Sequence, residues 1–210
     1  MKRGQFITLE GCEGVGKSTN LQFIEQCLRE RGIDVVVTRE PGGTPLAEEI
    51  RELVLAKRNE KVNALAELLL IFAARAQHLQ EIIVPNLQAG RWVLCDRFTD
   101  ATYAYQGRGR GLNKGEVEQL EQLVQGELRP NLTILLDIDI EQGLQRADER
   151  GELDRFESEP REFFQTVRDA YLTRARREPD RFMIVDAAPP LVEVQAAIKQ
   201  ALEKFVSAHL

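Results

Sequence analysis

Short apolar runs alternate along the chain with longer amphipathic stretches, and the two patterns predict different elements. The apolar runs are continuous rather than alternating, which is typical of strands in a parallel sheet that is covered on both faces. The first reads "FITLEG" and the third "WVLCDR". The predicted strands are 6–11, 35–41, 92–97, 132–138 and 182–187.

The stretches between these runs have the spacing of amphipathic helices, predicted at 17–31, 46–57, 62–89, 114–126, 141–150, 160–178 and 190–208. Strands separated by helices predict an α/β fold, with a five-stranded parallel sheet flanked by helices on both faces. We expect residues 1–210 to form a single domain. Ligands of such folds bind beyond the carboxyl ends of the strands, where Glu10, Arg39, Glu40, Asp96 and Arg97 lie.

Composition and charge narrow the class of protein. The chain is 43% hydrophobic and 30% charged, with a formal net charge of −6, which argues against a general nucleic-acid binder. The cysteines and the two histidines lack the spacing of metal ligands, and we expect no catalytic role for His78. No secretory signal or membrane-length apolar stretch is visible, so we expect a cytoplasmic protein without a membrane partner.

Residues 11–18 read "GCEGVGKS" and match the pattern G-x-x-x-x-G-K-[ST]. A predicted strand precedes the match and a predicted helix follows it, which is the context that the motif requires. The glycines let backbone N–H groups point at phosphate oxygens, and the helix adds its positive end. Lys17 is positioned to reach the outer phosphates and Ser18 to offer a hydroxyl to Mg²⁺. The motif predicts ATP or GTP binding.

The chemistry performed on the nucleotide depends on a second segment, "DRFTDATYAYQGRGRG" at 96–111. Asp96 and Arg97 end a predicted strand, where Asp96 is suited to a Mg²⁺-bound water and Arg97 to an acceptor phosphate. A GTPase would need N-K-x-D after a strand, and the nearest match, "NKGE" at 113–116, lacks the aspartate. A kinase is favoured; a nucleotide-hydrolysing switch and a kinase of another small acceptor stay as alternatives.

Six segments in this order resemble bacterial thymidylate kinases: "EGCEGVGKST", "TREPGGTPLAEEIR", "FAARAQHL", "DRFTDATYAYQGRGRG", "LRPNLTILLDI" and "RGELDRFE". The resemblance spans residues 5 to about 172. It implies a P-loop kinase fold with a mobile lid at about 146–157, and transfer of the γ-phosphoryl group of ATP to dTMP with Mg²⁺. It also implies a homodimer, for which the apolar segment 64–76 is suited.

The resemblance assigns roles to individual residues. It implies catalytic roles for Glu13, Lys17, Arg97 and Arg150, and metal-binding roles for Ser18 and Asp96. ATP would contact Gly11, Cys12, Glu13, Gly14, Val15, Gly16, Lys17, Ser18, Thr19 and Arg146. The acceptor would contact Glu13, Arg39, Glu40, Arg51, Ile71, Phe72, Arg75, Arg97, Thr102, Tyr105 and Gln106.

Two positions differ from the pattern of many family members. Ile71 stands where a base-stacking phenylalanine is common, with Phe72 one place along; either Ile71 supplies an apolar wall or Phe72 is brought in by a shifted helix. Gly14 stands where some relatives place a catalytic arginine, which resembles the type whose lid supplies the positive charge. Arg150 is the first candidate for that charge, with Arg146 and Arg155 next.

Overall fold

The computed structural model describes residues 3–148 and 154–209. Its strands are β1 (Phe6–Glu10), β2 (Val35–Arg39), β3 (Trp92–Asp96), β4 (Leu132–Asp137) and β5 (Phe182–Asp186). They form one sheet of order β2-β3-β1-β4-β5 in which every pairing is parallel. The predicted five-stranded parallel sheet is therefore confirmed, with each strand inside its predicted range.

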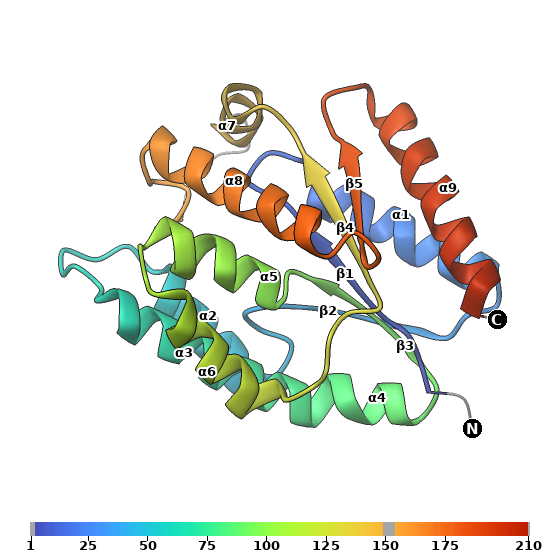
Figure 1. Cartoon of the computed structure of the whole chain (residues 1–210), viewed down its shortest axis with the longest axis horizontal. Helices are drawn as coiled ribbons and strands as arrows, with labels where there is room; N and C mark the ends of the chain where they lie inside the picture. Colours follow the sequence, from blue (N-terminus) through green and yellow to red (C-terminus); the bar gives the residue numbers. More distant parts are fainter. Residues whose placement is uncertain (1–2, 149–153, 210) are drawn as a thin grey trace.

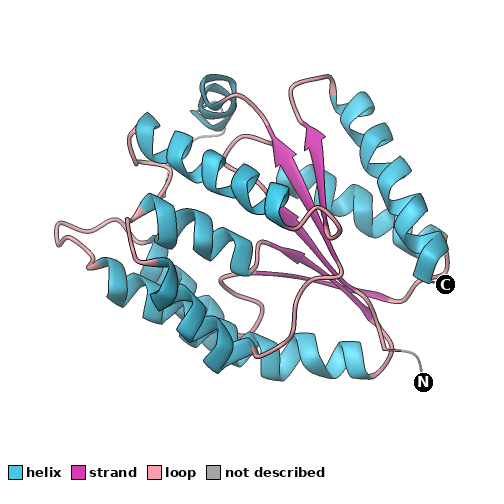
Figure 2. Cartoon of the chain, in the orientation of Figure 1, coloured by secondary structure: helices cyan, strands magenta, loops and turns pink. Residues whose placement is uncertain are grey.

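Helices cover both faces of the sheet (Figures 1 and 2). On one side lie α1 (Lys17–Glu30) and α9 (Leu191–His209), which pack on each other. The other side carries α3 (Ala64–His78), α4 (Val84–Gln88), α5 (Thr99–Thr102) and α8 (Arg161–Arg177), with α2 (Pro45–Leu55) and α6 (Lys114–Gln125) outside them. The short helix α7 (Ile140–Asp148) follows β4. No helix in the described part of the chain is long and apolar enough to cross a membrane.

The helical run predicted at 62–89 is interrupted by a π-helical turn. Helix α3 ends at His78, the turn η1 spans Leu79–Ile83, and α4 continues to Gln88. Pro85 lies at the start of α4. A proline there removes one backbone donor and hinders regular α-helical bonding, and a wider turn accommodates it.

The segment that follows β3 differs from the sequence prediction. No helix was predicted between residues 97 and 114, but α5 continues directly into the π-helical segment η2 (Tyr103–Gly109). Gly109 permits this path, because a Cβ there would lie 2.7 Å from the ring of Phe163 on α8. The chain turns only after the helix, at Gly111, which has a φ of 74°.

Strand register decides which side chains meet at the carboxyl edge. Asp96 pairs with Leu9 of β1 on one side and with Arg39 of β2 on the other. Central strand β1 is fully buried along its length, so the loop after it starts from a fixed point. The residues that follow β1, β2 and β3 are therefore brought together above the middle of the sheet.

Candidate active site

The loop between β1 and α1 has the backbone of a phosphate cradle. Gly11, Gly14 and Gly16 have φ values of 145°, 73° and 82°, a region that favours glycine. The Lys17 ammonium folds over the loop and donates to the carbonyl oxygens of Gly11 (3.2 Å) and Cys12 (3.0 Å). Burial, and next the charge of Arg97, lower the pKa of Lys17. A cation in this position is well placed to bind an anion that enters the loop.

Gly14 lies directly against helix α7. A Cβ built on Gly14 would meet the carbonyl oxygen of Gly143 at 1.8 Å, and a Cβ on Gly143 would meet the Glu13 carbonyl oxygen at 2.9 Å. The two backbones can approach this closely only because both residues lack side chains. This contact joins the phosphate loop to the helix that leads into the predicted lid.

Arg97 leaves β3 in a left-handed conformation, with a φ of 67°, which is uncommon for a residue with a side chain. Its Nη2 donates to Glu13 Oε1 at 2.6 Å, and its guanidinium lies 4.8 Å from the centre of the Tyr105 ring. The Tyr105 hydroxyl donates to the same Glu13 oxygen at 3.0 Å. Arg97 Nη1 and Asp96 Oδ1 are buried without a hydrogen-bond partner among the described residues. Strain and unsatisfied groups of this kind mark functional sites.

A second arginine faces the same space from helix α2. Arg51 donates to the carbonyl oxygen of Pro41 at 3.0 Å, in the turn that follows Glu40. Burial, and then the charges of Arg39 and Arg97, lower the pKa of Arg51. Lys17, Arg51 and Arg97 thus crowd positive charge into one region, and a bound phosphate would relieve that repulsion.

The far end of the site contains a buried chain of polar groups around Arg75. Arg75 Nε donates to Glu40 Oε2 at 2.7 Å, and its Nη2 donates to Thr102 Oγ1 at 2.9 Å. The other Glu40 oxygen is 3.0 Å from His78 Nδ1, and His78 Nε2 is 2.6 Å from Thr38 Oγ1. Arg75 is 2% exposed, and its Nη1 has no partner in the ranges that the structure describes. That nitrogen is a donor held ready for a ligand.

Gln106 stands beside Arg75 and is held by a second buried carboxylate. Its Nε2 donates to Glu67 Oε1 at 2.8 Å. Glu67 also accepts from Arg110 Nε at 3.3 Å and from Arg155 Nη2 at 2.6 Å. Because the single amide nitrogen of Gln106 donates to Glu67, its amide oxygen is left to accept a hydrogen bond from a ligand.

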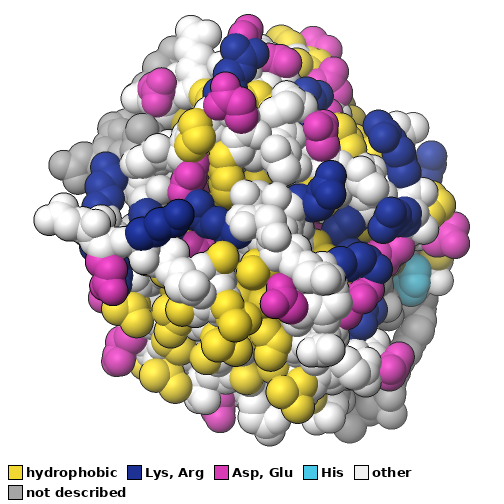
Figure 3. All heavy atoms as spheres, turned by 60° about the vertical axis from the view of Figure 1, so that its left-hand side comes forward, with side chains coloured by type: hydrophobic (Ala, Val, Ile, Leu, Met, Phe, Trp, Pro, Cys, Tyr) yellow, Lys and Arg dark blue, Asp and Glu magenta, His cyan; other side chains and the backbone are white. Residues whose placement is uncertain are grey.

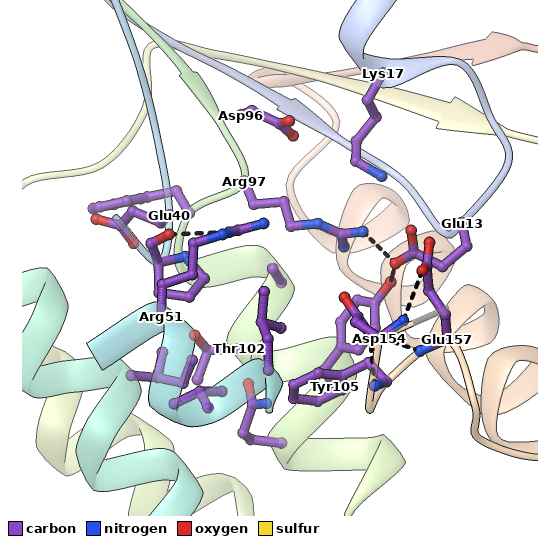
Figure 4. A pocket seen from close by; sticks show the side chains of 18 of the residues that line it. Glu13, Lys17, Glu40, Arg51, Asp96, Arg97, Thr102, Tyr105, Asp154 and Glu157 are labelled. Carbon is purple, nitrogen blue, oxygen red and sulfur yellow. Dashed lines mark hydrogen bonds and ion pairs between the residues drawn. The ribbon is translucent and has the colours of Figure 1, made fainter. Parts of the chain in front are cut away.

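These groups line one cavity of about 250 Å³ that reaches from the phosphate loop to Arg75 and Gln106. Figure 4 shows the side chains of Lys17 and Arg97 reaching into the site from the same side, with Arg97 directed at Glu13 and Tyr105 below them. Apolar walls come from Val54, Leu55, Ile71, Phe98 and Ala101. A polar phosphate end and a half-apolar end with one donor and one acceptor suit a nucleotide.

The fold and this cavity can be compared with known proteins. The family model "Thymidylate kinase" matches residues 9–198. A thymidylate kinase from Teredinibacter turnerae is 62% identical over 97% of this chain and 99% of its own. One from Pseudomonas putida is 62% identical over 94% and 95%. The chain belongs to the thymidylate kinase family.

A solved structure agrees with this assignment. The crystal structure of thymidylate kinase from Ehrlichia chaffeensis superposes with a TM-score of 0.77 and 32% identity, covering 95% of this chain and 99% of that one. The resemblance of the sequence to thymidylate kinases and the predicted P-loop kinase fold are both confirmed.

Some predicted site residues of this thymidylate kinase family member lie elsewhere. The exposed side chain of Arg39 pairs with Glu48 at 2.7 Å and does not line the cavity, because its strand position points it outward. Ile71 lines the cavity, whereas Phe72 packs with Leu68, Tyr103 and Val117, one helical position away. Arg39 and Phe72 therefore both lie outside the lining of this cavity.

The predicted lid residues divide into three cases. Arg146 donates to the carbonyl oxygens of Ala187 (2.9 Å) and Ala188 (3.0 Å), beside but outside the cavity. Arg155 is held by Glu67 and by the carbonyl oxygen of Val54 at 2.8 Å. Arg150 lies outside the described residues.

Three residues of the phosphate loop and the helix after it, Gly11, Cys12 and Thr19, do not line the cavity either. The carbonyl oxygens of Gly11 and Cys12 accept hydrogen bonds from Lys17.

Several residues of the site were not found from the sequence. His78 is completely buried and holds Glu40, although we expected no catalytic role for it. One face of α3 carries buried residues at helical spacing: Glu67, Ile71, Arg75 and His78. The polar residues on this otherwise apolar face were the signal in the sequence that could have indicated the network. Asp154, Phe156 and Glu157, which belong to the predicted lid, also line the cavity, although the sequence analysis gave them no role in the site.

Proposed function

We propose that the protein transfers the γ-phosphoryl group of ATP to dTMP, giving dTDP and ADP. One observation carries the proposal: a single cavity is lined by the phosphate loop, by Arg97, and by a hydrogen-bond donor (Arg75) and a hydrogen-bond acceptor (Gln106) suited to a base. Membership of the thymidylate kinase family supports it. The loop gives the nucleotide donor a site, and the other end of the cavity gives the phosphate acceptor one.

The base end supports thymine as the acceptor's base. Arg75 Nη1 can only donate, and with Nε2 of Gln106 committed to Glu67, the Gln106 amide oxygen can only accept. Thymine offers an oxygen at O4 and an N–H at N3, which complement this pair. Cytosine presents the reverse order, with an amino group at C4 and a lone pair at N3. Ile71 forms part of the apolar wall beside the base.

The reaction needs positioning and charge neutralisation rather than a strong base, because a phosphate acceptor is already anionic near neutral pH. Arg51 and Arg97 would hold the acceptor phosphate, and Lys17 would hold the phosphates of ATP. Arg97 lies between the two and would bind the transferring group. Lid arginines, with Arg150 first, would close the site and exclude water.

The residues present fit a Mg²⁺ ion. Asp96 Oδ1 is buried and has no partner among the described residues, and Ser18 lines the same cavity from the loop. Carboxylate and hydroxyl oxygens, directly or through water, are ligands that Mg²⁺ prefers. Such an ion would neutralise charge on the phosphates of ATP.

Tyr105 and Glu13 would contact the sugar of the acceptor. The Tyr105 ring is fixed edge-on by Phe156, Phe163 and Tyr171, with centroid separations of 5.9–6.3 Å. Its hydroxyl binds Glu13, so ring and carboxylate form one wall of the cavity. A rigid wall on the 2′ side favours a deoxyribose, since a ribose would bury an unpaired hydroxyl.

The assembly proposed is a homodimer, with the chain folded as one domain and acting in the cytoplasm on small molecules rather than on nucleic acid or membranes. Leu46 and Leu53 of α2 and Leu65 and Leu69 of α3 are between 43% and 50% exposed, and the two helices pack together. Figure 3 shows hydrophobic side chains gathered on the face of the molecule that it brings forward. An apolar face of this kind suits a second copy.

ATP consumption measured against a panel of nucleoside monophosphates tests the proposal. Stimulation by dTMP well above that by dCMP, dGMP and dAMP is expected. Equal stimulation by another monophosphate would identify a kinase of a different acceptor. Hydrolysis of ATP that needs no acceptor would identify a nucleotide-hydrolysing switch and overturn the proposal.

A further inference from the structure

We propose that Glu67, which lies outside the cavity, is a positioning residue that sets which base the enzyme accepts, acting through Gln106. The inference rests on the proposed function, because it concerns the acceptor's base. Glu67 is absent from the lining of the cavity and 1% exposed. It makes its contacts behind the side chains that face the base.

An amide side chain has no fixed polarity of its own. Rotating the Gln106 amide by 180° exchanges its oxygen and nitrogen with almost no change in shape. The cavity would then offer two donors, Arg75 Nη1 and Gln106 Nε2, instead of a donor and an acceptor. Something must decide between the two orientations, and the shape of the pocket does not.

Glu67 decides it because a carboxylate only accepts hydrogen bonds. With Glu67 Oε1 at 2.8 Å, the Gln106 nitrogen must face the carboxylate. The reverse orientation would bring two oxygens together in a buried place, which is costly. Arg110 and Arg155 also approach this carboxylate, at 3.3 Å and 2.6 Å, so three hydrogen-bond donors surround the Glu67 oxygens.

Arg75 does not need such a device. A guanidinium cannot accept a hydrogen bond in any rotamer, so Arg75 always disfavours an amino group at C4 of the base. Discrimination between thymine and cytosine therefore has two contributions: one from Arg75, which does not depend on its orientation, and one from Gln106, which depends on how its amide is oriented. Only the contribution from Gln106 depends on Glu67.

The matched pair of acceptors for the test is dTMP and 5-methyl-dCMP, which differ only in the hydrogen-bonding edge of the base. The wild-type enzyme should favour dTMP in kcat/KM by on the order of 10³-fold or more. In Glu67→Gln the partner of Gln106 can also donate, so the Gln106 amide is free to turn. We expect the ratio to narrow by about tenfold or more, through slower use of dTMP and faster use of 5-methyl-dCMP.

Three further variants separate positioning from a merely structural effect. Glu121→Gln is the matched control: Glu121 is also buried, binds Tyr103 of the same helical segment and pairs with Arg129 at 3.0 Å. Its ratio should stay at the wild-type value. Glu67→Asp keeps an acceptor-only group and should retain most of the preference. In a Gln106→Met background, Glu67→Gln should leave the ratio unchanged.

The outcomes are distinct from failure of the proposed function. If the wild-type enzyme does not use dTMP, the proposed function is wrong. If it does, and Glu67→Gln slows both acceptors by the same factor, Glu67 is only a structural residue and the inference is wrong. Should Glu67→Gln not fold, Glu67→Asp decides: a ratio that holds supports the inference, and a tenfold narrower ratio overturns it.

Discussion

Replacing Arg75 by methionine tests whether Arg75 and Glu40 form a buried ion pair that stabilises the fold and supports the use of dTMP. The side chains of Arg75 and Glu40 are only 1% and 3% exposed, and their hydrogen bond is 2.7 Å long. The guanidinium also lies 4.8 Å from the ring centre of Phe72 and 5.0 Å from that of Phe98. Methionine fills a similar volume and removes the charge, so Glu40 would remain buried with His78 alone.

The expected cost follows from this burial. Removing one partner of a buried pair destabilises a protein by about 3–5 kcal/mol, because the remaining charge is uncompensated. For a chain of this size, about 2–4 °C of melting temperature corresponds to each kcal/mol, so we expect a fall of roughly 6–20 °C. The double variant Arg75→Met/Glu40→Gln removes the stranded charge and should recover part of the lost stability, but not the use of dTMP.

The assay combines thermal and urea unfolding with the kinetics of dTMP phosphorylation. Arg39→Met is the control, because the Arg39 side chain is 52% exposed and its pair with Glu48 should contribute less than about 1 kcal/mol. If Arg75→Met were as stable as Arg39→Met, the buried pair would not exist as described. If the double variant used dTMP normally, Arg75 would not read the base.

Four other changes have definite expected outcomes. Lys17→Met should fold normally and lose on the order of 10²-fold or more in turnover; near-normal turnover would remove Lys17 from the chemistry. Tyr105→Ala should weaken dTMP use while narrowing the preference for dTMP over its ribose counterpart, measured as a ratio of kcat/KM; an equal loss on both would exclude a role in reading the sugar. Burial, and next the charge of Asp100, raise the pKa of Glu10 from 4.5 to about 8, so the stability that its proton contributes is complete below about pH 4.5 and is lost as pH rises through 8. Between pH 6 and pH 9, Glu10→Gln should therefore lose less stability in urea unfolding than the wild-type protein does. Equal losses in the two proteins would contradict this. Gly14→Ala should lower turnover, since a Cβ would lie 1.8 Å from the oxygen of Gly143, and an unaffected enzyme would show that the loop and helix separate easily.

Patterns local in the chain predicted the fold and the phosphate loop. The strands are continuous apolar runs, and the glycines of residues 11–16 are close in sequence to the lysine they serve, so a short window holds all the information. The helix from Thr99 to Gly109 was missed for a related reason. Its glycines indicate a turn locally, and only the approach of Phe163, far along the chain, explains Gly109 inside a helix.

The network behind the base could be predicted only in part. Arg75 was found through resemblance to a family, but nothing in the sequence links it to Glu40, which is 35 residues away, directly after β2. The pairing arises because β2 and α3 meet in three dimensions. Likewise, the sequence alone does not decide whether Ile71 or Phe72 lies beside the base. The orientation of α3 about its axis places Ile71 at the cavity and Phe72 in the core.

The close approach of Gly14 and Gly143 has a consequence for how this enzyme could change over generations. Relatives with an arginine in the phosphate loop cannot be reached from this chain by altering Gly14 alone, since any side chain there meets the backbone of α7. Helix α7 would have to shift in the same step, so we expect a substitution at position 14 to be accepted only together with changes that move α7.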